Sequence, residues 1–104
     1  MAILYNKLVR DRIPDIIEES GKACVTEILS DEEYLRMVDA KLDEELAEYH
    51  KDQTIEELAD LMEVIYAAVA CGYTIEHLEK ARAKKAEKRG AFQKKILLVE
   101  VKKD

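Results

Sequence analysis

The stretch LDEELAEYHKDQTIEELADLMEV, residues 42–64, decides the fold. It is rich in carboxylates, yet apolar side chains recur in it every three or four residues, which is typical of helices that bury one face. Thr54 followed three residues later by Glu57 is a capping-box pattern, so one helix ends near Lys51 and the next begins at Ile55. Because helices joined by a short link pack as antiparallel neighbours, we predict a helical hairpin.

Two acidic pairs, Glu45-x-x-Glu48 and Glu57-x-x-Asp60, lie within this predicted hairpin. The members of each pair share a helix face, about 4.5 Å apart along the axis. Folding the chain between the two helices places Glu45 level with Asp60 and Glu48 level with Glu57. Helix axes pack about 8–10 Å apart, so the four carboxylates converge and repel one another. We therefore predict that they bind Mg²⁺, which prefers oxygen ligands.

The same residues also fit a solvated helix surface, and the capping box alone accounts for Glu57. Two features favour a site: Glu45 continues an apolar stripe, and Asp60 lies in a helix interior, where aspartate is unfavourable. A di-iron carboxylate bundle would use Glu-x-x-His pairs. Neither His50 nor His77 follows a glutamate by three residues, so iron is discounted and both histidines are expected at the surface.

The whole chain is predicted to be mainly α, with helices over about 12–20, 31–51, 55–71 and 75–88. Their expected N-caps are Asp11, Ser30, Thr54 and Thr74. On the third helix the buried stripe is expected to be Ile55, Leu58, Met62, Ile65 and Val69. The aliphatic or β-branched runs CVTEIL (24–29) and ILLVEV (96–101) are expected to pair. The predicted fold is a four-helix bundle-like domain with a central antiparallel hairpin and a small two-stranded β element.

With 104 residues, the chain is expected to form a single domain over 1–104. Its net charge of −6 argues against a partner that is a DNA or RNA polymer or an anionic membrane. The charge is uneven, because residues 31–63 are acidic and residues 80–95 are basic. The basic run fits either a helix end whose cations favour the dipole or a phosphate-binding segment.

Cys24 and Cys71 have no metal-binding spacing and are expected as small core residues in a reducing cytosol. No apolar run follows the basic residues near the N-terminus, so no signal peptide is expected. No stretch is apolar enough to predict a membrane span.

Four segments together resemble the MazG-like, all-α nucleoside triphosphate pyrophosphohydrolase superfamily, and most of all its phosphoribosyl-ATP pyrophosphohydrolase-like branch. They are YNKLVRDRIP (5–14), KLDEELAEY (41–49), EELADLMEVI (56–65) and RGAF (89–92). No single motif is decisive; their order and spacing carry the resemblance, which spans nearly the whole chain. This sequence departs from the family pattern in two places. The gap between its acidic pairs is short, and Ala91 stands where the family pattern has a second glycine.

The resemblance implies catalytic and metal-binding roles for Glu45, Glu48, Glu57 and Asp60, with Mg²⁺ or Mn²⁺ as the cofactor. It implies phosphate contacts from a basic segment, matched here by Lys84, Lys88 and Arg89. Lys7 and Arg10, in the KLVRD segment, are further substrate-binding candidates. It also implies a homodimer or homotetramer.

The function expected from these features is a cytoplasmic, Mg²⁺-dependent enzyme that hydrolyses a nucleoside triphosphate or related nucleotide to a monophosphate and pyrophosphate, in a house-cleaning role. One alternative is a non-catalytic helical adaptor or regulatory protein of the same fold. Another is a phosphoribosyl-ATP pyrophosphohydrolase of histidine synthesis, which shares the chemistry and differs in substrate.

Overall fold

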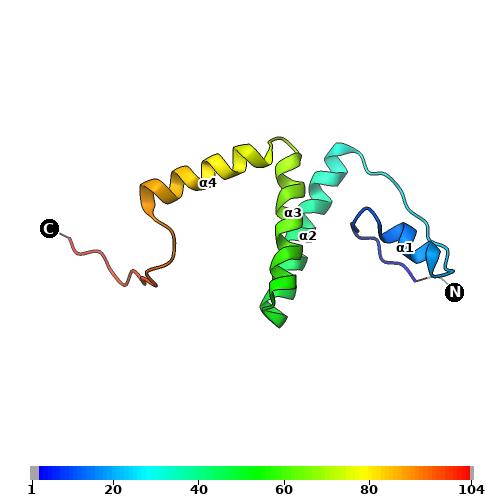
Figure 1. Ribbon diagram of the computed structural model, residues 1–104, viewed down its shortest axis with the longest axis horizontal. Helices are drawn as coiled ribbons and strands as arrows, with labels where there is room; N and C mark the ends of the chain where they lie inside the picture. The colour runs from blue at the N-terminus through cyan, green and yellow to red at the C-terminus, as the bar shows by residue number, and fades with distance from the viewer. Residues whose placement is uncertain (1–2, 104) are drawn as a thin grey trace. The chain divides into compact units, whose positions relative to one another are not determined.

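The computed structural model describes residues 3–103, and within this range the chain forms four α-helices. They are α1 (Ile13–Glu19), α2 (Asp31–Asp52), α3 (Ile55–Ala70) and α4 (Ile75–Arg89), shown in Figure 1. The prediction of a mainly α protein is confirmed, and each helix lies within a few residues of its predicted bounds.

The chain divides into two compact units between Gly72 and Tyr73. The first contains α1, α2 and α3, and the second contains α4 and the residues that follow it. The organisation of 1–104 as a single domain therefore stays a prediction, and each unit is described by itself below.

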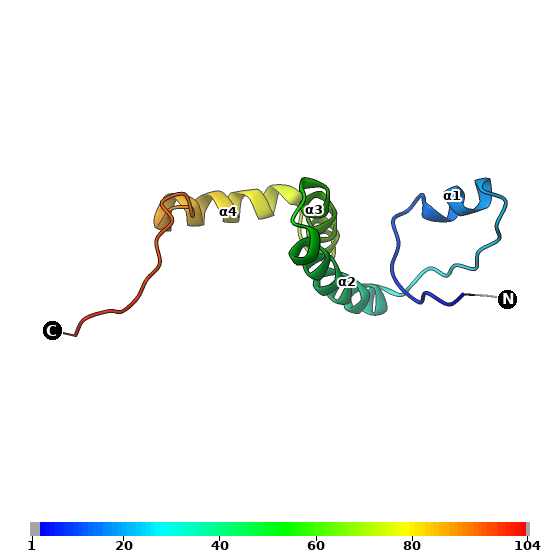
Figure 2. The same ribbon diagram turned by 90° about the horizontal axis from the view of Figure 1, so that it is seen from below.

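The first unit is built around a hairpin in which α2 and α3 lie side by side (Figures 1 and 2). The chain reverses at Gln53, which adopts the left-handed conformation (φ 51°) and donates its amide hydrogen to the carbonyl of Tyr49 at 2.7 Å. The next residue, Thr54, accepts a hydrogen bond from the amide of Glu57 at 3.2 Å and so starts α3. The predicted hairpin is confirmed.

The face of α2 expected to be buried, which carries Leu35, Val38, Leu42, Glu45 and Tyr49, packs inward except at Leu35, which is 52% exposed. Val38 is 1% exposed and is the one fully buried apolar side chain among the described residues. Leu42, Glu45 and Tyr49 continue the same stripe and are half-buried. A carboxylate therefore lies on the inner face of α2, as the spacing predicts.

The prediction of a buried apolar stripe on α3 is wrong for the first three of its five residues. Ile55, Leu58 and Met62 are exposed, whereas Leu61 and Val64 are half-buried. The second half of α3 is apolar on nearly every side, and a single neighbouring helix covers only one face. Periodicity alone therefore did not determine which face of α3 meets α2.

The predicted two-stranded β element is not supported. Residues 24–29 and 96–101 have no regular secondary structure, and Val25 and Ile28 are fully exposed. Short extended runs need a partner strand to persist. Pairing these two runs would close a loop that spans most of the chain, and a short strand provides few contacts to offset that loss of entropy.

The remaining sequence-based details are partly wrong. Helix α1 begins at Ile13 with Arg12 as its N-cap and no side-chain cap, so Asp11 does not cap it. Cys71 is exposed and Cys24 is only half-buried, which contradicts their placement in the core. Within residues 3–103, no single helix has the length and apolarity to cross a membrane.

Candidate functional site

The hairpin brings together Glu45 of α2 and Glu57 and Asp60 of α3, here called the central trio. One carboxylate oxygen from each residue lies within 4.8 Å of the other two. Glu45 is on the inner stripe of α2, and Glu57 and Asp60 are three residues apart on the first turns of α3. All three side chains are half-buried.

A second group, the outer trio, consists of Glu48, Asp52 and Glu57. Its carboxylate oxygens also lie within 4.8 Å of one another, and Glu48 and Asp52 are exposed. The four acidic residues predicted from the sequence therefore form two overlapping groups that share Glu57. Asp52 was missed because α2 was predicted to end at Lys51, one residue too early. Its position four residues after Glu48, on the same helix face, was the signal that could have identified it.

Two basic residues of the N-terminal segment reach the hairpin. Arg10 donates a hydrogen bond from its guanidinium to Oδ1 of Asp60 at 2.7 Å, and Lys7 donates from Nζ to Oε1 of Glu44 at 3.4 Å. These contacts join residues 50 and 37 positions apart. The structure thus places both N-terminal candidates beside the acidic residues, and Arg10 contacts the central trio itself.

Lys41, one turn before Glu45 on α2, provides another positive charge. Its ammonium lies 3.5 Å from Oε1 of Glu45 and 3.3 Å from Oε1 of Glu44. Glu45 and Asp60 therefore each have a cationic neighbour. Glu57 has none among the ion pairs of the described residues, although it belongs to both trios.

The pKa values of two glutamates in the hairpin, Glu57 and Glu44, shift in opposite directions. The pKa of Glu57 is raised above its ordinary value, first by partial desolvation and then by the negative charges of Asp60, Asp52, Glu48 and Glu45. Partial desolvation acts in the same direction on Glu44. Hydrogen bonds and charge attraction from Lys41 and Lys7 outweigh it there, so the pKa of Glu44 is lowered. Negative charge is therefore less compensated at Glu57 than at Glu44.

The donors of both trios are carboxylate oxygens, which are the ligands that Mg²⁺ and Mn²⁺ prefer. The half-buried position of the central trio and the uncompensated charge at Glu57 fit such a cation. Exposed acidic groups also cluster in proteins without binding an ion.

The basic candidates Lys84, Lys88 and Arg89 lie on α4, in the second unit, and all three are exposed. Within α4 the ion pairs are local: Lys80 with Glu76 at 3.6 Å, and Arg82 with Glu79. The prediction that the three residues at the end of the helix contact a phosphate stays a prediction. His77 accepts a hydrogen bond from the Thr74 amide at 3.3 Å and so helps to cap α4.

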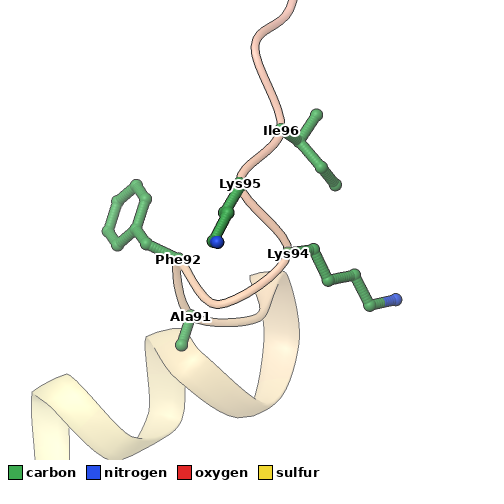
Figure 3. Close-up of a pocket in the computed structure, with 5 residues that line it drawn as sticks. All are labelled: Ala91, Phe92, Lys94, Lys95 and Ile96. Carbon is green, nitrogen blue, oxygen red and sulfur yellow. The ribbon is translucent and has the colours of Figure 1, made fainter.

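A hollow of about 290 Å³ follows α4 and is lined by Ala91, Phe92, Lys94, Lys95 and Ile96 (Figure 3). It has no carboxylate in its lining. Lys94 extends away from the turn in the figure, and the Phe92 ring is fully exposed. These residues provide two ammonium groups and little enclosure, so the hollow does not form a second acidic or catalytic cluster.

Comparison with known proteins gives a match to part of the chain. An uncharacterized protein from Mycolicibacterium smegmatis is 54% identical over 48 residues, which is 46% of this chain and 49% of that protein. The chain thus matches about half the length of this relative. No family model matches the sequence, and no solved structure matches it significantly.

Proposed function

We propose that the protein is a Mg²⁺-dependent nucleotide pyrophosphohydrolase that converts a nucleoside triphosphate or related nucleotide to a monophosphate and pyrophosphate, in a house-cleaning role in the cytoplasm. The observation that carries the proposal is the central trio, in which three carboxylates from two helices approach within 4.8 Å. The sequence resemblance to MazG-like enzymes also supports it, partly through the same carboxylates.

In this proposal Glu45, Glu57 and Asp60 hold the ion, with Glu48 and Asp52 at the edge of the site. When bound, Mg²⁺ or Mn²⁺ neutralises phosphate charge and lowers the pKa of a water molecule. A carboxylate of the two trios that does not coordinate the ion accepts the proton of the attacking water. The guanidinium and ammonium groups of Lys84, Lys88 and Arg89 contact the phosphates, with Lys7 and Arg10 as further candidates.

The proposed active form is a homodimer or homotetramer. Its support is the apolar surface of α3: Ile55, Leu58 and Met62 are exposed on one side, and Met62 is 47% exposed in mid-helix. Two hairpins packed through these faces would form a four-helix bundle between protomers. The bundle-like domain predicted from the sequence differs from it, because it uses the four helices of one chain. Light scattering coupled to size exclusion measures the mass directly, and a monomer at micromolar concentration would contradict this part of the proposal.

The enzymatic proposal is tested by measuring pyrophosphate release from a panel of nucleoside triphosphates and from phosphoribosyl-ATP, with Mg²⁺ and with EDTA. We expect release that depends on Mg²⁺, with one monophosphate formed for each pyrophosphate. The preferred substrate separates a house-cleaning enzyme from an enzyme of histidine synthesis. Release of orthophosphate instead, or no turnover by folded protein, contradicts the proposal.

A non-catalytic helical adaptor is the second candidate. The observation that favours it is that Lys41 and Arg10 already lie beside two of the three central carboxylates. In that case the cluster is an ion-pair network that stabilises the hairpin without a metal. The adaptor would show no turnover, and its melting temperature would not respond to millimolar Mg²⁺.

A further inference from the structure

The contact between Arg10 and Asp60 has a consequence for cation binding. Asp60 belongs to the central trio, and its Oδ1 accepts a hydrogen bond from the Arg10 guanidinium at 2.7 Å. A positively charged group of the chain therefore already occupies one of the proposed ligands. A divalent cation that binds there meets a resident cation on the same carboxylate, and the two positive charges repel each other.

The segment that carries Arg10 is held only lightly in place. Residues 3–10 have no regular secondary structure. Within the described chain, the side-chain hydrogen bonds of longest sequence separation are Arg10 to Asp60 and Lys7 to Glu44, and both start from this segment. The Arg10 side chain is 57% exposed and that of Asp60 is 43% exposed. Exposed ion pairs are weak, so a bound divalent ion can displace this one.

We propose that Arg10 is a built-in competitor of the metal: it neutralises Asp60 in the metal-free protein, and cation binding releases it together with the N-terminal segment. This inference rests on the proposed cation site and adds a regulatory contact to it. Residues 3–12 would then contact the hairpin when the site is empty and leave it when a cation is bound.

A matched pair of variants separates direct competition from a general change in charge. Arg10→Gln and Lys7→Gln each remove one positive charge from the same segment, but Lys7 contacts Glu44, which is outside both trios. Binding of Mn²⁺ to the full-length protein is measured from the loss of the electron paramagnetic resonance signal of the free ion. We expect Arg10→Gln to bind Mn²⁺ about two- to fivefold more tightly than Lys7→Gln, the range that corresponds to an exposed ion pair.

The alternative role for Arg10 is to position Asp60 as a ligand, and it makes the opposite prediction. A positioning arginine would leave Arg10→Gln with weaker Mn²⁺ binding than Lys7→Gln, and that result overturns the competitor proposal. Equal affinities for the two variants overturn it as well. Circular dichroism of both variants checks that α2 and α3 remain helical.

Hydrogen exchange of the wild-type protein gives a second readout that does not depend on activity. We expect the amides of residues 7–12 to exchange faster with Mn²⁺ than with EDTA, while those of α2 become more protected. Slower exchange in residues 7–12 on adding Mn²⁺ contradicts release of the segment.

The same measurements distinguish failure of this proposal from failure of the cation site. If wild-type protein binds Mn²⁺ and Glu57→Gln does not, the site stands, and only the comparison of Arg10→Gln with Lys7→Gln decides the competitor proposal. If neither wild type nor Arg10→Gln binds Mn²⁺, the site itself is refuted and the competitor proposal with it. If Arg10→Gln binds Mn²⁺ while wild type and Lys7→Gln do not, the competitor proposal is supported most strongly.

Discussion

The hairpin and α4 are both densely charged, but their charged side chains have different partners. On α4 the ion pairs join residues three or four positions apart, Glu76 with Lys80 and Glu79 with Arg82. In the hairpin, carboxylates of two helices approach one another, and their cationic partners include Arg10, which is 50 positions away from Asp60.

The difference shows what a second helix contributes. A single helix separates its charges by its own periodicity, so Glu76 and Glu79 of α4 each pair with a lysine or arginine three or four residues further along. A packed pair of helices adds neighbours that the local sequence does not balance. Glu57 is the result, because it has carboxylate neighbours on both helices and no cation among the ion pairs of the described residues.

The largest effect predicted from this comparison is on catalysis. Loss of an outer-shell partner alone typically costs about 10–100-fold in metal affinity or activity, so Glu57→Gln, which alters both trios, is expected to reduce Mg²⁺-dependent pyrophosphate release about 100-fold or more. Glu79→Gln on α4 is the matched control and should retain wild-type activity. Equal losses in the two variants would mean that the trios have no special role.

Next in size is stabilisation by the ion. A ligand that binds only the folded protein adds about 1.4 kcal/mol to its stability at ten times its Kd. We therefore expect Mg²⁺ to raise the melting temperature of wild-type protein and to leave that of Asp60→Asn nearly unchanged. Differential scanning fluorimetry with a magnesium titration measures both. A similar shift in the variant would show that Mg²⁺ acts elsewhere on the chain.

The helix caps provide a third test, with an expected effect of about 1 kcal/mol. Thr54 and Thr74 accept equivalent hydrogen bonds from the amides of Glu57 and His77, at 3.2 and 3.1 Å. Thr54→Ala should lower the free energy of unfolding of the hairpin by that amount, as measured in urea. Thr74→Ala is the comparison: the same loss in the same transition would indicate the single cooperative domain that the sequence predicts. No loss for Thr54→Ala would contradict the role of this cap.

The smallest effect expected is on the pH dependence of stability without metal. Because the pKa of Glu57 is raised in the folded protein, its ionisation opposes folding, and this cost appears as the pH rises above the ordinary value of 4.5. Glu57→Gln should therefore be more stable than wild type at pH 7 in EDTA and lose that advantage below pH 4.5.

For Glu79 we expect the opposite effect of pH on the free energy of unfolding. Its pKa is lowered by the hydrogen bond from Arg82, so its ionised form contributes stability that is lost as the pH falls. Glu79→Gln should therefore be slightly less stable than wild type at pH 7 and equal to it in acid. Urea midpoints at pH 7 and pH 4 test both variants, and two shifts of the same sign at pH 7 would contradict the contrast between hairpin and α4.

The features that could be predicted from the sequence are those fixed within one helix or one turn. Thr54 and Ser30 cap their helices, and Glu45 lies on the inner stripe of α2, because these depend on neighbours three or four residues away. The pairing of acidic residues across the hairpin followed from the short link. Most of the predictions that failed depend on a distant partner, and the N-cap assigned to Asp11 is a local exception.

Three failures have this cause. The face of α3 that meets α2 was wrong because α3 is apolar on several sides, and residues 24–29 and 96–101 do not pair although each resembles a strand. The contact of Arg10 with Asp60 had no signal in spacing, since it starts from a segment without regular structure. Arg10 was a candidate only through the family resemblance.

The link between α2 and α3 has a consequence for how this sequence can change. Only Gln53 and Thr54 separate the two helices, so the positions of Glu45 and Asp60 depend on counting residues from the turn. One residue inserted within a helix rotates everything beyond it by about 100° around the axis. Insertions and deletions within segment 45–60 should therefore separate the acidic residues even where both helices still form, whereas residues 91–103 have no such constraint from the hairpin.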